Sequence, residues 1–197
     1  MSGASKTLLI ACGALAREVL AVIRLNGLSH LELTCLPAIL HNRPERIPDA
    51  VRAKIRGARG AYEGILVLYG DCGTGGALDR VLEEEGVERI PGPHCYAFFS
   101  GVDAFLEQAE ADPFSFYLTD YLARHFERLV IEGLGLDRHP ELLPLYFGHY
   151  QKLVYLAQAP DPELERRAEQ AAARLGLAYE RRATGYGELA EFVRQAA

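Results

Sequence analysis

The chain has 197 residues, of which 49% are hydrophobic and 24% charged, a balance typical of a globular protein that buries a core without disulfides. Its formal net charge of −6 and its lack of a dense lysine and arginine block argue against nucleic acid as a partner. No apolar run approaches the roughly 20 residues of a membrane-spanning helix, so we expect no membrane partner either.

The first βα unit is predicted at the amino terminus. Residues 6–11 form an apolar run that ends at Cys12, and residues 14–26 continue as a helix. The apolar run is better explained as a first strand than as a secretory segment, which predicts a cytoplasmic protein with reduced cysteines.

Further βα units follow in chain order. The clearest strand, GILVLY, is the uninterrupted apolar run expected when both faces of a sheet are covered. From Phe114 to Tyr150 the pattern changes to two amphipathic helices, the second of them kinked, which predicts a helical insertion. Before it we predict strands at 31–36, 64–69 and 87–90, helices at 44–56 and 77–85, and a helical stretch from 95 to about 111; after it, strands at 152–156 and 177–181 and helices at 162–175 and 186–195.

These alternating elements predict a single α/β domain over residues 1–197. We expect a mostly parallel, Rossmann-like, three-layer sheet with helices on both faces and the helical insertion at about 114–150.

Cysteine and histidine side chains follow four successive predicted strands. Cys12 follows the first strand, His41 lies in the loop after the second, Cys72 follows the third, and His94 and Cys95 follow the fourth. Each is weak evidence alone, because an isolated cysteine is more often a small buried hydrophobe. In a parallel sheet these positions share one edge, where ligands bind, so their coincidence favours a common site.

Thiolate and imidazole are ligands that hold zinc or iron. We predict a zinc site with Cys12, Cys72, Cys95 and His94 as ligands, and iron or an iron–sulfur cluster is the alternative. His41 and His94 are candidates for catalytic acid and base, and the role of either as a ligand stays open. Because adjacent residues in an extended loop tend to point apart, His94 and Cys95 need not bind the same ion. Cys35, inside a strand, is predicted to be core.

The turn YGDCGTGG allows a second interpretation. A glycine loop between a strand and a helix can bind an anion through free backbone N–H groups, with Gly70, Gly73, Thr74 and Gly75 as candidate cofactor-binding residues. It lacks both the lysine of a P-loop and the GxGxxG spacing, and a plain tight turn is at least equally compatible.

In the predicted insertion, spacings of four, four and three place Tyr117, Tyr121, His125 and Arg128 on one helix face. Such a face is usually solvated. Asp120 or His125 are the candidates there for hydrogen bonds to a metal-bound histidine.

Several long strings resemble a known family. The strings are LPAILHNRPERIP, LYGDCGTGG, GPHCYAFFSG, FYLTDYLARHFERLVIEGLGLDRHPELLPLYFGHY and KLVYLAQ, and the resemblance runs from residue 12 to about 158. They resemble the bacterial and archaeal family of unknown function numbered 1638. The resemblance implies shared positions at Cys12, His41, Cys72, His94 and Cys95, and a link to corrinoid-dependent methyl transfer or one-carbon metabolism.

Two functions are therefore carried forward. The first is a metal-dependent enzyme or accessory protein of corrinoid or one-carbon metabolism, with a small molecule or a corrinoid protein as partner. The alternative is a non-catalytic binding or escort module that uses loop 70–76 for a corrinoid, a nucleotide or a partner protein. Whether the protein is an enzyme, and its oligomeric state, stay open at this stage.

Overall fold

The structure is a computed structural model that describes residues 6–196, so residues 1–5 and 197 of the predicted single domain lie outside the described residues. The chain forms two compact units. The first comprises residues up to Phe98 together with those from Tyr186 onward, and the second comprises Phe99–Gly185.

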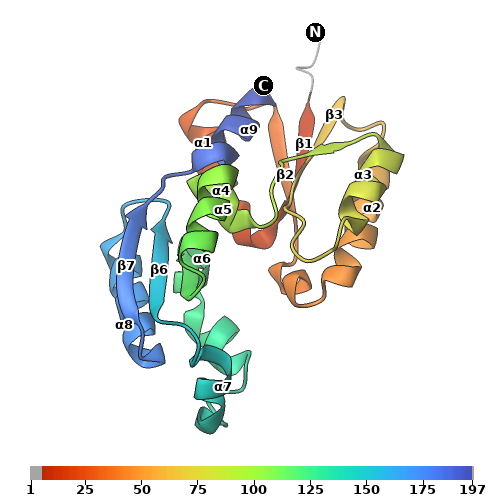
Figure 1. Cartoon of the computed structure of the whole chain (residues 1–197). Coiled ribbons are helices and arrows are strands. Elements are labelled where there is room, and N and C mark those ends of the chain that lie inside the picture. Colours follow the sequence, from red (N-terminus) through yellow and green to blue (C-terminus); the bar gives the residue numbers. More distant parts are fainter. Residues whose placement is uncertain (1–5, 197) are drawn as a thin grey trace. The chain divides into compact units, whose positions relative to one another are not determined.

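The first unit is built on a four-stranded parallel sheet with the order β2-β1-β3-β4 (Figure 1). From β1 the chain runs outward to β2 on one side and to β3 and then β4 on the other. The carboxyl ends of β1 and β3 therefore flank the point where the direction of winding reverses. The strands are β1 (Thr7–Cys12), β2 (Leu31–Leu36), β3 (Gly64–Leu68) and β4 (Glu88–Arg89).

Helices cover both faces of this sheet. Helices α1 and α9 pack together on one face and α2 and α3 on the other (Figure 1). The second pair closes a core in which Ile10, Val51, Val67 and Leu78 are fully buried. The elements are η1 (Gly13–Leu15), α1 (Ala16–Leu25), η2 (Ala38–Asn42), η3 (Pro44–Arg46), α2 (Ile47–Ala58), α3 (Ala77–Glu85), α4 (Cys95–Ser100), whose last residues belong to the second unit, and α9 (Gly187–Gln195).

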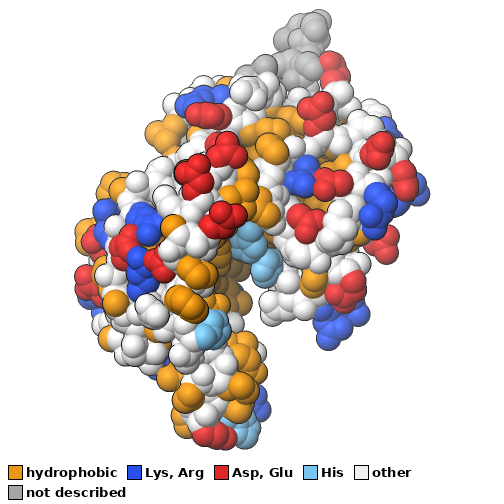
Figure 2. All heavy atoms as spheres, in the orientation of Figure 1, with side chains coloured by type: hydrophobic (Ala, Val, Ile, Leu, Met, Phe, Trp, Pro, Cys, Tyr) orange, Lys and Arg blue, Asp and Glu red, His pale blue; other side chains and the backbone are white. Residues whose placement is uncertain are grey.

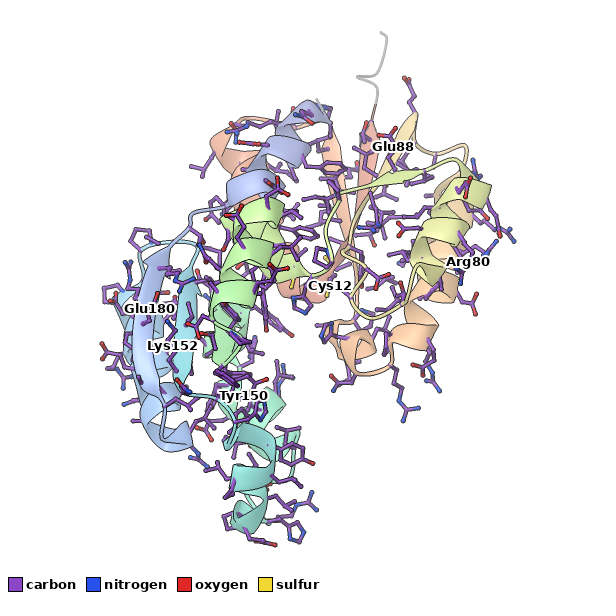
Figure 3. All side chains as sticks on the ribbon, in the orientation of Figure 1. Cys12, Arg80, Glu88, Tyr150, Lys152 and Glu180 are labelled. Atoms are coloured by element: carbon purple, nitrogen blue, oxygen red, sulfur yellow. The ribbon has the colours of Figure 1, made fainter. Side chains whose placement is uncertain are left out.

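The second unit contains a separate parallel sheet with the order β5-β6-β7. Lys152 and Glu180 point toward each other from β6 and β7 and form an ion pair of 2.7 Å (Figure 3). The elements are α5 (Val102–Ala111), β5 (Ser115–Thr119), α6 (Asp120–Arg124), the π-helix η4 (Glu127–Glu132), η5 (Pro140–Leu142), α7 (Leu143–Phe147), β6 (Lys152–Ala157), α8 (Pro162–Leu175) and β7 (Ala178–Ala183).

The predicted α/β class is confirmed, whereas the predicted helical insertion is wrong at its start. Residues 115–119 form β5, which pairs with β6 in parallel register. Tyr117, Leu118 and Thr119 are all buried, so this run fills a sheet covered on both faces. The helix begins only at Asp120, where the Thr119 hydroxyl caps it by accepting a hydrogen bond from the Leu122 N–H. Tyr117 therefore does not share a helix face with Tyr121 and His125.

A buried carboxylate joins the ends of β5 and β6. The Asp120 side chain accepts hydrogen bonds from the Tyr155 hydroxyl at 2.7 Å and from the backbone N–H groups of Gln158 at 3.1 Å and Ala159 at 3.3 Å. The Gln158 side chain in turn accepts from the Asp120 N–H at 2.7 Å. The connections after two neighbouring strands are thus tied to a single residue.

The described residues contain no helix with the length and apolar character needed to cross a lipid bilayer. Figure 2 shows acidic and basic side chains interspersed over the face that it presents.

Candidate functional site

The carboxyl edge of the first sheet places sulfur at the topological switch point. Cys12 is the last residue of β1 (Figure 3), and Cys72 lies in the loop that follows β3. His94 and Cys95 follow β4, with Cys95 opening α4. Open parallel sheets bind their ligands in the crevice at this edge, next to the strands where the winding reverses.

Two loops at this edge are joined through their backbones. The N–H of Asp71 donates to the Gly92 carbonyl at 3.0 Å, and that of Cys72 donates to the Pro93 carbonyl at 2.9 Å. Gly70 permits this approach, because a Cβ atom there would lie 3.0 Å from both the N and the Cα of His94. The loop carrying Cys72 and the loop carrying His94 therefore form one connected piece.

Cys72 has a strained backbone. Its φ of 50° places it in the left-handed region, and it is the one non-glycine residue with positive φ in the described part of the chain. This conformation costs about 1–2 kcal/mol for a residue with a Cβ atom. Such strain gathers at functional sites, so the conformation is a second indication that this loop binds something.

The thiols of Cys12, Cys72 and Cys95 influence one another. Burial, reinforced by Cys12, raises the pKa of Cys72 to about 11. Burial also raises the pKa of Cys95, with smaller contributions from Cys72 and Cys12, and burial raises the pKa of Cys12. Without a nearby cation all three are neutral thiols at pH 7, and each thiolate formed would oppose the next.

His94 connects the thiols to the second histidine. The Cys95 Sγ lies 3.7 Å from His94 Nδ1, and His94 Nε2 lies 3.5 Å from His41 Nε2. The Tyr96 N–H donates to His94 Nδ1 at 3.4 Å, so neutral His94 carries its proton on Nε2, facing His41. Nδ1 also lies beside the sulfur, and a metal ion bound at Nδ1 would displace the Tyr96 N–H from its lone pair. The expectation that His94 and Cys95 point apart is wrong, because Cys95 starts a helix instead of continuing an extended loop.

Burial, followed by the nearby His41, lowers the pKa of His94 to about 4. A histidine with a lowered pKa in the folded state stabilises the fold fully above its unfolded pKa of about 6.5, and this contribution is lost as the pH falls toward the folded value. We therefore expect the metal-free protein to lose up to about 3 kcal/mol of unfolding free energy through His94 between roughly pH 6.5 and 4.

Urea denaturation across this pH range checks that expectation. His94→Gln should flatten the pH dependence more than His139→Gln, which alters an exposed histidine in the second unit and serves as the control. Equal slopes for the wild type and His94→Gln would contradict the assigned environment of His94.

In the glycine-rich loop 70–76, the carboxylate of Asp71 occupies hydrogen-bond donors that an external anion could otherwise use. The Asp71 carboxylate accepts hydrogen bonds from the Gly76 N–H at 2.8 Å, the Gly75 N–H at 3.2 Å and the Thr74 hydroxyl at 2.7 Å. The Gly76 N–H is the largest of the contacts that lower the pKa of Asp71. These donors already serve a carboxylate of the same loop, so Thr74 and Gly75 take part in a self-capped turn, and the cofactor role of Gly70, Gly73, Thr74 and Gly75 stays a prediction.

Two residues near the thiols escaped the sequence analysis. Tyr69, after β3, is 2% exposed, and its hydroxyl makes no hydrogen bond of ordinary geometry to a described residue. Burial, and then the Cys12 thiol, raise the pKa of Tyr69.

Glu18 on α1 is 5% exposed, and its charge raises the pKa of Cys95. The sequence pattern could have predicted that Glu18 is buried, because it falls on the apolar stripe formed by Leu15, Val19 and Val22.

The remaining candidates differ in their surroundings. Cys35 is half-buried in β2, less enclosed than a core residue. His41 lies on η2 and is exposed. Asp120 and His125 belong to the second unit, and their predicted hydrogen bonds to a metal ligand stay a prediction. Across residues 6–196, no three or more His, Cys, Asp or Glu side chains already form a group that could hold a metal ion.

Comparison with known proteins identifies the family. The profile described as "Protein of unknown function (DUF1638)" matches residues 35–193, most of the chain. The chain belongs to the DUF1638 family. The match covers Cys72, His94 and Cys95 of this DUF1638 protein, whereas Cys12 precedes the matched segment.

A search of curated protein sequences found no significant match for this DUF1638 chain. Among solved structures, it is similar to ornithine carbamoyltransferase from Pyrococcus furiosus, with 16% identity and a TM-score of 0.29. The similarity covers 90% of this chain and 54% of that enzyme, so the chain spans about half the length of this relative. A likeness this distant carries no argument about activity.

Proposed function

We propose that this DUF1638 protein binds one zinc ion at the switch point of its first sheet, through Cys12, Cys72, Cys95 and His94. The observation that carries the proposal is the 3.7 Å distance between Cys95 Sγ and His94 Nδ1. A sulfur and a nitrogen bound to the same tetrahedral zinc ion are separated by about 3.6 Å, given bonds of about 2.3 and 2.05 Å. The pair thus already has the spacing of two zinc ligands.

The other two ligands would come from thiols that share this edge. Cys12 and Cys72 lie close enough to Cys95 to raise its pKa, and rotation of side chains would be needed to complete the set. Zinc fits these surroundings because a divalent cation favours the thiolate form that burial opposes here. Binding would release protons, so the apparent affinity is expected to rise with pH.

His41 would position His94. With Nδ1 facing the ion, the proton on His94 Nε2 is directed at His41 Nε2, 3.5 Å away. A hydrogen bond from the second ring nitrogen is the usual way a protein fixes the tautomer and orientation of a histidine ligand. His41 is also exposed, so it is the better placed of the two histidines to exchange a proton with a substrate.

Iron remains the alternative metal, because thiolate and imidazole also bind it. When bound, zinc acts as a Lewis acid if one of its positions is open to water or substrate. A role in corrinoid or one-carbon metabolism stays a prediction that rests on the family resemblance.

Elemental analysis of untagged protein purified anaerobically tests the proposal. We expect about one equivalent of zinc per chain in the wild type, and a value near zero in Cys95→Ser, because loss of one thiolate opens a four-ligand site. Cys35→Ser is the matched control, since Cys35 lies within β2 and should keep the metal. A metal-free wild type that also fails to take up added zinc or ferrous iron would refute the site.

A further inference from the structure

The second unit contains a cavity of about 600 Å³ whose wall is rich in arginine. It lies among α6, η4 and α8, and every lining residue belongs to the second unit. The zinc site proposed above involves none of these residues. Its arginines are Arg124, Arg128, Arg166, Arg167 and Arg174.

Carboxylates offset only part of this charge. Glu163 binds both Arg166, at 2.8 Å, and Arg167, at 2.9 Å, and Glu127 lies 3.4 Å from Arg174. Five arginines less these two glutamates leave three positive charges in a protein whose net charge is −6. The lining is therefore strongly positive against the balance of the whole chain.

Two of these three uncompensated charges lie on α6 and η4, and the third is on α8, where Arg166 and Arg167 share Glu163. Arg124 and Arg128 form no ion pair with a carboxylate among the described residues. Arg124 donates to the Asp120 carbonyl, whereas the Asp120 carboxylate is occupied by Tyr155 and two backbone N–H groups. Their guanidinium groups keep donors available for a ligand.

Packing holds these charges together despite their repulsion. On α8, apolar residues including Leu164, Ala168 and Leu175 are buried in the core of the second unit, which leaves Arg167 and Arg174 on the side facing the cavity. Arg167 Nη1 reaches the Arg124 carbonyl at 3.5 Å, which links the two walls. The arginines are gathered by the fold and are not scattered over the surface.

An irregular helix supplies an independent observation. Arg128 lies in η4, a π-helical segment over Glu127–Glu132. The π-helix is rare, and it is found mostly where a protein re-aims side chains at a functional site. Here the irregular turns carry Glu127 and Arg128 into the cavity wall.

We propose that this cavity, defined by Arg124, Arg128, Arg166, Arg167 and Arg174, binds a small organic phosphate with more than one negative charge. The planar guanidinium fork pairs with two oxygens of a phosphate group, which makes arginine the side chain most suited to this ligand. The volume lies within the range of small-molecule sites, about 300–1,000 Å³. Three excess positive charges match an anion of the polyphosphate or nucleotide type.

Isothermal titration with ATP and with inorganic triphosphate tests the site, using full-length protein treated with a chelator and no added metal. At about 50 mM salt we expect both probes to bind with a dissociation constant below about 1 mM, and to weaken as salt is raised. Arg124→Gln combined with Arg128→Gln should weaken both probes at least about tenfold, because two charge-assisted contacts to the phosphate oxygens are lost.

The matched control is Arg138→Gln with Arg181→Gln, which removes the same charge from the second unit outside the cavity. It should bind both probes as the wild type does. Equal weakening in the two double variants, no binding of either probe, or binding of uncharged adenosine as tight as that of ATP would overturn the proposal. Cys95→Ser should bind ATP normally, which separates this result from the outcome for zinc.

Discussion

Cys72→Gly should weaken zinc binding at least about a hundredfold while it raises the stability of the metal-free protein by about 0.5–1 kcal/mol. Structural zinc binding of about 10–16 kcal/mol shared by four ligands makes one thiolate worth about 2.5–4 kcal/mol, which corresponds to roughly a hundredfold or more. Glycine meanwhile adopts the φ of 50° without the strain that a Cβ atom brings.

Competition with a chromophoric chelator measures the affinity, and urea denaturation of chelator-treated protein measures the stability. Cys72→Ser separates the two effects, because serine loses the thiolate and keeps the strained backbone. It should therefore lose zinc without a gain in stability. A parallel loss of affinity and stability in Cys72→Gly would show that the thiol acts in packing instead.

Asp120→Ala should destabilise the second unit by about 3–5 kcal/mol, because it leaves several buried donors without an acceptor. The donors are the Tyr155 hydroxyl and the N–H groups of Gln158 and Ala159. Asp120 is itself only 4% exposed, so water cannot easily take its place.

Urea denaturation and hydrogen exchange of the β5 and β6 amides measure this effect. Tyr155→Phe removes one donor and should cost about 1–2 kcal/mol. Asp137→Ala, at an exposed position 3.9 Å from Arg138, should change little. If Asp120→Ala and Asp137→Ala are equally stable, the carboxylate does not hold the ends of β5 and β6 together.

In the first unit, the observed strands and helices agree closely with those predicted from the sequence. The aliphatic run GILVLY forms β3 and is followed by a turn, and the helix predicted at 77–85 has the observed bounds of α3. Here periodicity, apolar runs and terminal glycines all indicate the same structure. Placing Cys12 at the end of one strand, and Cys72 and His94 after two others, required only the order of the elements.

The second unit shows where local patterns mislead. Aromatic residues spaced four apart made FYLTDYLARHF look like one helix, although its first part pairs with β6, a partner more than 30 residues away along the chain. Tertiary pairing overrides helix-like spacing in such a segment. The arginine-lined cavity was equally hidden, because its two walls come from distant stretches whose charges each resemble an ordinary solvated face.

The two backbone hydrogen bonds between the loops at 70–73 and 91–94 bear on how fast a metal ion would exchange at the proposed site. Hydrogen bonds from Asp71 and Cys72 hold these loops in register, so a metal ion at the proposed site would meet two loops that are already joined. If the proposed zinc site forms, such preorganisation would favour rapid capture and slow release of the ion, and zinc would then be lost only slowly to a competing chelator.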